Sequence, residues 1–98
     1  MILVRDVMQV KFGQMDQVLA GLKGAEGQLA AMRVSRILTD VSGPYFTLVI
    51  ETRAESVDAY WQAMQEGFAM EEAGTSPFVQ YIESGYREFY TIEYEAGS

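Results

Sequence analysis

The apolar residues of this chain alternate between the two-residue period of strands and the longer period of helices. Residues 2–11 predict a first strand, because they are rich in β-branched side chains and their charges follow no helical period. The next stretch, FGQMDQVLAGLKG, places its apolar side chains on one helical face, at Met15, Val18, Leu19 and Leu22. We expect this helix to end near Gly24, since glycine inside a helix costs about 1 kcal/mol relative to alanine.

Two strand-like runs follow, AAMRVSRILTDV and YFTLVIET, separated by a turn at residues 42–44. Because the turn is short, the two runs are expected to pair as an antiparallel hairpin. Alternation in the first run places Arg36 on the face that we expect to meet the helices, together with Met32, Val34 and Leu38. Alternation in the second run separates two faces, one with Phe46, Leu48 and Ile50 and the other with Tyr45, Thr47, Val49 and Glu51.

A second long helix is predicted over residues 52–74. Thr52 or Ser56 is its candidate N-cap, and Gly74 lies just past its end. Its apolar stripe consists of Val57, Tyr60, Trp61, Met64 and Phe68. A third, short helix is predicted from Pro77 to about residue 84, with Ser76 as its candidate N-cap and Gly85 as its stop.

The closing stretch YREFYTIEYE, residues 86–95, predicts the last strand. The element order is therefore βαββαβ, the α+β arrangement called ferredoxin-like, with a short extra helix before the last strand. It predicts a four-stranded antiparallel sheet with both long helices on one face. We expect a single domain over residues 1–95, followed by a frayed tail at 96–98.

The sheet face away from the helices is predicted to be apolar as well, because both faces of the last strand carry aromatic or aliphatic side chains. An exposed apolar patch of this kind usually marks an interface, so the sequence predicts a homodimer formed with a second copy of the chain. Arg5, Arg33, Glu51 and Arg87 are placed on this side, either as interfacial salt bridges or as an anion site. The candidate interface residues are Tyr45, Val49, Arg33, Glu51 and Phe89.

The composition narrows the function further. The net charge is −7, from 14 acidic and 7 basic residues, and the basic residues form no cluster, so we expect binding to neither nucleic acid nor anionic membranes. The first ten residues lack the features of a signal peptide, and no apolar run approaches a membrane span, so a cytoplasmic location is expected. The sequence has no cysteine and no histidine, which removes the thiol nucleophile, the Ser-His-Asp triad and the commonest metal ligands; we expect no metal and no cofactor.

Three stretches resemble the dimeric α+β-barrel superfamily, and within it the small NIPSNAP-like and antibiotic-biosynthesis-monooxygenase-like bacterial proteins. These stretches are VKFGQMDQVLAGLK, YFTLVIETRAESVDAYWQAM and SGYREFYTIE, and with them the resemblance covers nearly the whole chain. It implies a dimer whose two sheets form a shared barrel with the helices outside. Trp61 matches an aromatic position that monooxygenase relatives place between helix and sheet, whereas the histidine of haem-degrading relatives has no counterpart.

The candidate chemistry rests on a few side chains. Tyr60, Trp61 and Met64 either line a pocket for a flat aromatic molecule or form the core face of the second helix. Arg36, with Tyr90 nearby, either anchors a carboxylate or enolate or belongs to an internal ion pair. Asp6 lies among apolar residues of the first strand and needs a partner, because an unpaired buried charge is expensive.

Three hypotheses for the function follow. The first is a homodimeric barrel protein of uncharacterised function that binds a small apolar or aromatic molecule. The second is a cofactor-independent monooxygenase or isomerase acting on an activated phenol or enol, with Arg36, Trp61 and Tyr90 as its candidate residues. The third is a protein-interaction module that binds through a sheet edge or the helices.

Overall fold

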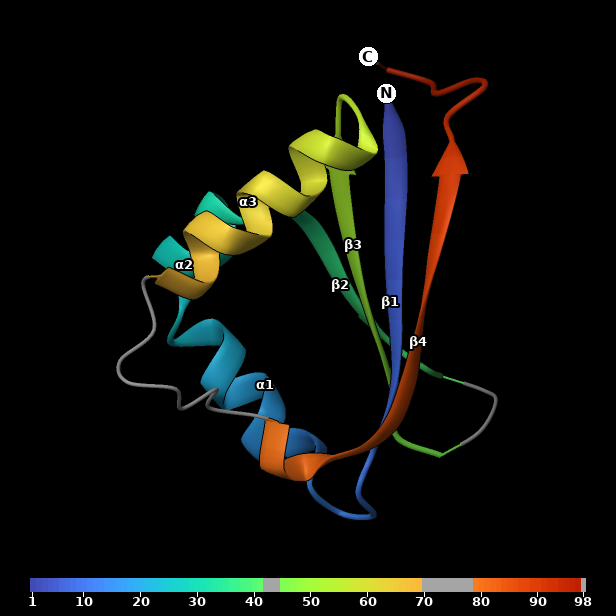
Figure 1. Cartoon of the computed structure of the whole chain (residues 1–98). Coiled ribbons are helices and arrows are strands. Elements are labelled where there is room, and N and C mark those ends of the chain that lie inside the picture. Colours follow the sequence, from blue (N-terminus) through green and yellow to red (C-terminus); the bar gives the residue numbers. More distant parts are fainter. Residues whose placement is uncertain (42–44, 70–78, 98) are drawn as a thin grey trace.

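The computed structural model describes residues 1–41, 45–69 and 79–97, except the side chains of residues 68, 69 and 79. The elements in chain order are β1 (Ile2–Val10), α1 (Met15–Lys23), α2 (Glu26–Ala31), β2 (Val34–Thr39), β3 (Thr47–Ala54), α3 (Val57–Ala69), the 3-10 turn η1 (Val79–Tyr81) and β4 (Ile82–Thr91). The strands form one antiparallel sheet in the order β2-β3-β1-β4. Figure 1 shows the helices gathered on one side of this sheet, which confirms the ferredoxin-like α+β fold.

The strand alternation decides which side chains meet the helices. On β1 the buried residues Val4 and Val10 point towards the helices, and on β3 Leu48 and Ile50 do the same. Two apolar clusters fill this side: one joins β1 and β3 to α1, and the other joins them to α3. The first cluster is built on Val10, Val18, Leu22, Leu48 and Ile50, and the second on Val4, Ala54, Tyr60 and Met64. The predicted core face of β3 is thereby confirmed.

A β-bulge in β2 overturns the predicted position of Arg36. Val34 pairs with Thr52 of β3, whereas Arg36, two residues later, pairs with the adjacent residue Glu51. The extra residue on β2 shifts the alternation, so Arg36 and Leu38 lie on the side of the sheet away from the helices. The expectation that both residues meet the helices was therefore wrong.

The last third of the chain also differs from the prediction. Of the residues expected as a third helix, those that the structure describes form the turn η1 and the start of β4, which runs from Ile82 to Thr91. Gly85 is a strand residue and not a helix stop, and it lies close to its partner strand β1: an added Cβ would come within 3.0 Å of the Val7 carbonyl oxygen. The predicted cap Ser76, with Pro77 and Gly74, falls outside the described residues.

The long helices agree more closely with the sequence pattern. α1 ends at Lys23, and α3 begins after Ser56, whose Oγ accepts a hydrogen bond of 3.1 Å from the Ala59 amide. Thr52, the other candidate cap, is buried in β3. The short helix α2 was not expected; it is followed by Met32, whose side chain lies against Gly67 of α3 in a space that a Cβ would fill. None of the described helices combines the length and apolar character needed to cross a membrane.

Candidate functional site

The ligand candidates named from the sequence fall on opposite sides of the sheet. Asp6, Tyr60, Trp61 and Met64 lie between the sheet and α3, on the helix-covered face. Arg36 and Tyr90 lie on the other face, which we call the open face because no described helix covers it. The structure therefore does not bring Arg36 and Trp61 together, and a single pocket built on both is wrong.

The helix-side cluster consists of Asp6, Tyr60, Trp61, Arg87 and Phe89. Asp6 accepts a hydrogen bond of 3.2 Å from the Tyr60 hydroxyl and one of 2.5 Å from Nε of Arg87. Arg87 reaches Asp6 because the two residues pair directly across β1 and β4. Asp6 thus finds the partner that a charge among apolar residues requires.

Aromatic rings surround the guanidinium group of this cluster. Its central carbon lies 4.9 Å from the ring centroid of Trp61 and 5.5 Å from that of Tyr60, within the range of a cation–π interaction. Phe89 meets Tyr60 edge-on at 5.7 Å between centroids. Tyr60 is fully buried, whereas Trp61 remains 44% exposed and Phe89 42% exposed. The cluster therefore presents aromatic surface and a cation to solvent, above a buried phenol and a partly buried carboxylate.

Met64 behaves as a core residue and not as part of this surface. It is 5% exposed and packs in the apolar cluster with Val4 and Ala54. For Met64 the structure thus favours the core alternative that the helical spacing left open.

Burial and the neighbouring Asp6 carboxylate raise the pKa of Tyr60 from the usual 10 to about 12. The folded chain therefore holds the phenol proton more tightly than the unfolded chain does. The raised pKa of Tyr60 therefore stabilises the folded state. This stabilisation is complete below pH 10, where Tyr60 is protonated in both the folded and the unfolded chain, and it is lost as the pH rises towards 12.

We therefore expect the stability advantage of the wild type over the Tyr60→Phe variant to shrink between pH 10 and pH 12. Urea denaturation of both proteins at several alkaline pH values measures this difference in unfolding free energy. The Tyr45→Phe variant is the control, because Tyr45 is 78% exposed and its replacement leaves Tyr60 in place. A wild type and a Tyr60→Phe variant whose stabilities fall in parallel would contradict the assignment.

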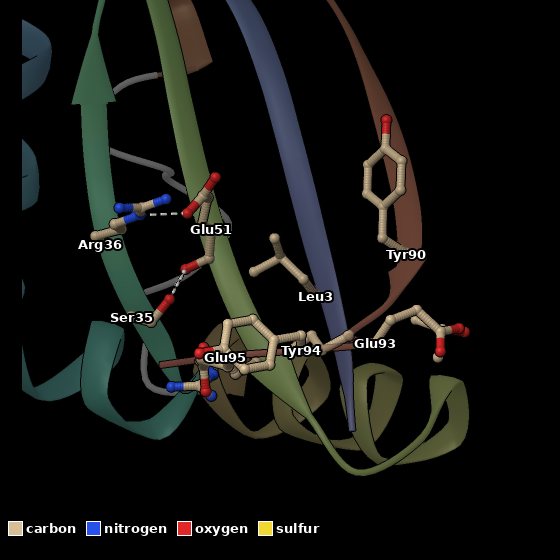
Figure 2. Close-up of a pocket in the computed structure, with 11 residues that line it drawn as sticks. Leu3, Ser35, Arg36, Glu51, Tyr90, Glu93, Tyr94 and Glu95 are labelled. Atoms are coloured by element: carbon tan, nitrogen blue, oxygen red, sulfur yellow. Dashed lines mark hydrogen bonds and ion pairs between the residues drawn. The ribbon is translucent and has the colours of Figure 1, made fainter. Parts of the chain in front are cut away.

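The open face carries a line of alternating charges across all four strands, which we call the charge row: Arg36, Glu51, Arg5 and Glu88. Arg36 of β2 pairs with Glu51 of β3, as Figure 2 shows. Nε of Arg5 lies 3.3 Å from Oε2 of Glu51, and Nη1 of Arg5 lies 3.2 Å from Oε1 of Glu88. The Glu51 side chain is only 5% exposed, so its charge is held between two arginines.

Tyr90 extends this network at the edge of β4. Its hydroxyl donates a hydrogen bond of 2.7 Å to Oε2 of Glu88, and this bond raises the pKa of Tyr90 above its usual value. A groove of about 610 Å³ runs beside the charge row, bounded by Leu3, Tyr90 and the segment after β4. Figure 2 shows Tyr94 and Glu95 of that segment at the end of the groove, where an ion pair between Glu95 and Arg53 holds it.

The interface candidates named from the sequence divide in the same way. Val49 and Glu51 lie on the open face, as predicted. Phe89 was expected there, together with Arg87, and this was wrong: the β4 register sets Phe89 opposite Val4, on the helix-covered face. Arg33 was wrong as well, because it precedes β2 in a left-handed conformation with φ 63° and lies in a notch beside α3. Tyr45 lies just before β3 and is exposed.

The sequence missed Arg87 and Phe89 as members of the helix-side cluster. The signal that would have found them is the shared alternation of Asp6 and Arg87, two opposite charges on strands predicted to pair. Among the described residues, no group of three or more acidic side chains is placed to hold a metal ion.

No protein-family model matches the sequence, and no curated protein matches it. Solved structures do. A NIPSNAP domain protein from Burkholderia xenovorans superposes with a TM-score of 0.77 at 18% identity, over 100% of this chain and 98% of that one. A NIPSNAP family protein of unknown function from Agrobacterium tumefaciens superposes with a TM-score of 0.73 at 14% identity, over 91% of this chain and 85% of that one.

A candidate antibiotic biosynthesis monooxygenase from Nitrosomonas europaea is also similar, with a TM-score of 0.61 at 13% identity, over 96% of this chain and 100% of that one. Likeness at such low identity concerns the fold and not the chemistry. The chain therefore has the ferredoxin-like α+β fold found in NIPSNAP and antibiotic-biosynthesis-monooxygenase-like proteins, as its sequence resemblance implied.

Proposed function

We propose that this protein binds a small aromatic molecule with an acidic group at the helix-side cluster. The observation that carries this proposal is the position of Arg87, whose guanidinium lies over the exposed ring of Trp61, and the ring of Phe89 lies next to that of Trp61. A planar ligand would stack on these rings, and its carboxylate or phenolate would accept hydrogen bonds from the arginine fork.

The internal contacts of the cluster support this role. Within the described residues, Arg87 donates through Nε to Asp6, and its terminal nitrogens donate to no other side chain. Asp6 and the Tyr60 hydroxyl thus hold the guanidinium in a fixed position without using the groups that would meet a ligand. Such preorganisation lowers the entropy lost on binding.

Trp61 is the one tryptophan of the chain, and its fluorescence therefore reports on this cluster directly. Titration with a panel of aromatic carboxylates and phenols is expected to quench it saturably. The Arg87→Lys variant keeps the charge but loses the planar fork, so we expect its affinity to fall about tenfold or more. Arg33→Lys, at an arginine outside the cluster, is the matched control and should bind as the wild type does. Quenching that is linear in ligand, or equal in both variants, would refute the proposal.

A second candidate function is the oxygenation of an activated phenol without a cofactor, which is favoured by the position of the Arg87 guanidinium over the exposed ring of Trp61. The substrate would supply the electrons that reduce dioxygen, and Arg87 would stabilise its phenolate or enolate. Oxygen uptake with hydroquinone-type substrates tests it. Uptake above the protein-free rate that falls in Arg87→Lys but not in Arg33→Lys supports catalysis, and uptake at the protein-free rate excludes it for those substrates.

A further inference from the structure

A row of three residues crosses the open face beside the charge row, and we call it the mixed row. Arg53 of β3 pairs with Leu3 of β1, and Leu3 pairs with Tyr90 of β4, so the three residues are neighbours on one face of the sheet. All three line the groove of about 610 Å³. Figure 2 shows Leu3 between Glu51 and Tyr90. The mixed row thus presents a cation, an apolar side chain and a phenol to the groove, in that order.

The guanidinium group of Arg53 is only partly paired. Its Nη2 atom forms an ion pair with Oε1 of Glu95. Its Nε atom is buried and has no hydrogen-bond partner among the described residues. A carboxylate in the bidentate geometry accepts from two neighbouring N–H groups of an arginine at once. Arg53 therefore holds a buried donor that such a carboxylate would satisfy, and a buried donor without an acceptor calls for an explanation.

Glu95 belongs to a short segment at the end of the groove, residues 92–95, which we call the strap. The strap follows β4 and forms neither helix nor strand. At its start the Ile92 amide donates a hydrogen bond of 3.2 Å to the Met1 carbonyl oxygen, and at its end Glu95 meets Arg53. The side chains of Arg53 and Glu95 are 40% and 35% exposed. An ion pair that water reaches in this way is weak enough for another anion to replace.

Charge decides which kind of ligand the groove takes. With the strap in place, the charged residues that line the groove are two arginines and three glutamates. Two of these glutamates, Glu93 and Glu95, belong to the strap and leave with it. The groove then keeps Arg36 and Arg53 against Glu51, whose charge is already paired. Displacement of the strap thus changes the lining from net negative to net positive, which favours an anion.

We propose that the mixed row is a second binding site, for a small aliphatic carboxylate with a hydroxyl group at its far end, and that Glu95 occupies the carboxylate position when no ligand is bound. The ligand carboxylate replaces Glu95 and accepts from both Nε and Nη2 of Arg53. The ligand chain lies over Leu3, across two strand spacings of about 5 Å each. The ligand hydroxyl donates to the Tyr90 oxygen, whose own proton is held in a hydrogen bond of 2.7 Å to Glu88.

This site is separate from the helix-side cluster and does not depend on the function proposed for that cluster. The sheet lies between the two, because Trp61 is on α3 and the helices gather on the other side of the sheet (Figure 1). A probe without a ring distinguishes them, since it cannot stack on Trp61.

The test titrates 6-hydroxyhexanoate into the nitrogen-15-labelled chain and follows the amide signals by NMR. This probe carries a carboxylate and a hydroxyl on an unbranched apolar chain. We expect saturable shifts at Leu3, Arg53 and Tyr90, and an unchanged indole signal of Trp61. Shifts centred on Trp61, or no saturable shift in any variant, would overturn the site.

Two substitutions test the ends of the mixed row. Arg53→Gln is expected to weaken binding at least tenfold, because it removes the charge and the bidentate donors. Arg33→Gln, at an arginine outside the groove, is the matched control and should bind as the wild type does. Tyr90→Phe should weaken 6-hydroxyhexanoate about three- to tenfold and leave hexanoate, which has no hydroxyl, unaffected. An equal loss for both probes would contradict the role of Tyr90.

A third substitution tests the strap. Glu95→Gln removes the competing carboxylate at unchanged chain length, so we expect 6-hydroxyhexanoate to bind about two- to fivefold more tightly. Glu55→Gln, which removes an equal charge outside the groove, is its control and should leave the affinity unchanged. Equal or weaker binding by Glu95→Gln would show that Glu95 does not occupy the ligand position. Circular dichroism establishes that each variant is folded, and Glu95→Gln, beyond the last strand, keeps the test decisive if Arg53→Gln fails to fold.

Discussion

The Leu48→Ala variant is expected to lose about 2–5 kcal/mol of unfolding free energy. Leu48 is fully buried, and it packs with Val10, Val18 and Ile50 between the sheet and α1. The substitution removes the transfer free energy of the lost methyl groups and leaves a cavity that rigid neighbours fill only partly. The total unfolding free energy of a domain of this size is about 5–15 kcal/mol, so the loss is a large fraction of its stability.

Leu38→Ala provides the matched comparison, because Leu38 is the same residue type on the opposite face of the sheet. Leu38 is only half-buried within one chain, so denaturant titration at low protein concentration should show a smaller loss than for Leu48→Ala. If a second copy covers the open face, the loss for Leu38→Ala should grow with protein concentration. Equal losses for both variants at low concentration would contradict the assignment of the two faces.

The Asp6→Ala variant is expected to lose about 2–3 kcal/mol, the second largest effect. The carboxylate is the acceptor for the hydroxyl of fully buried Tyr60 and the counter-charge of Arg87. Its removal leaves a buried hydroxyl without its acceptor. The arginine is 38% exposed, and water compensates part of its loss, so the figure lies below that for a fully buried pair.

The Asp6→Asn variant separates the contribution of the Tyr60 hydrogen bond from that of the ion pair with Arg87. The amide oxygen still accepts the hydrogen bond from Tyr60, but the side chain carries no charge. We expect it to lose about half as much as Asp6→Ala in urea denaturation. In both variants the pKa of Tyr60 should fall from about 12 towards 10, since one cause of the increase is removed. Unchanged stability in Asp6→Ala would show that the contacts of this carboxylate contribute little to the fold.

The helix-side cluster was predictable in part. Asp6, Tyr60 and Trp61 were identified from sequence, because a charge among apolar residues and an aromatic helical stripe are local signals. Arg87 and Phe89 were placed on the wrong face. The Asp6 partner of Arg87 lies 81 residues away in the sequence, and Val4, which pairs with Phe89, lies at a similar separation. A slip of one residue in the alternation moves every side chain of a strand to the opposite face of the sheet.

The sequence by itself determined the order of the four strands and the two long helices, the α+β fold and the residues of β3 that form the core, such as Leu48 and Ile50. These follow from periodicity over short stretches, where each residue's preference depends on its near neighbours. The positions of charged residues along individual strands could also be identified from the sequence, but the charge row that they form across the sheet could not.

Only the tertiary structure decided which strand faces meet. The bulge in β2 moved Arg36 to the open face, and the register of β1 with β4 joined Arg5 to Glu88 and Asp6 to Arg87. Both depend on pairing between distant segments, which the packing of the whole sheet selects and no local pattern specifies. The charge row and the helix-side cluster therefore exist because strand pairing brings together residues that are distant in the sequence.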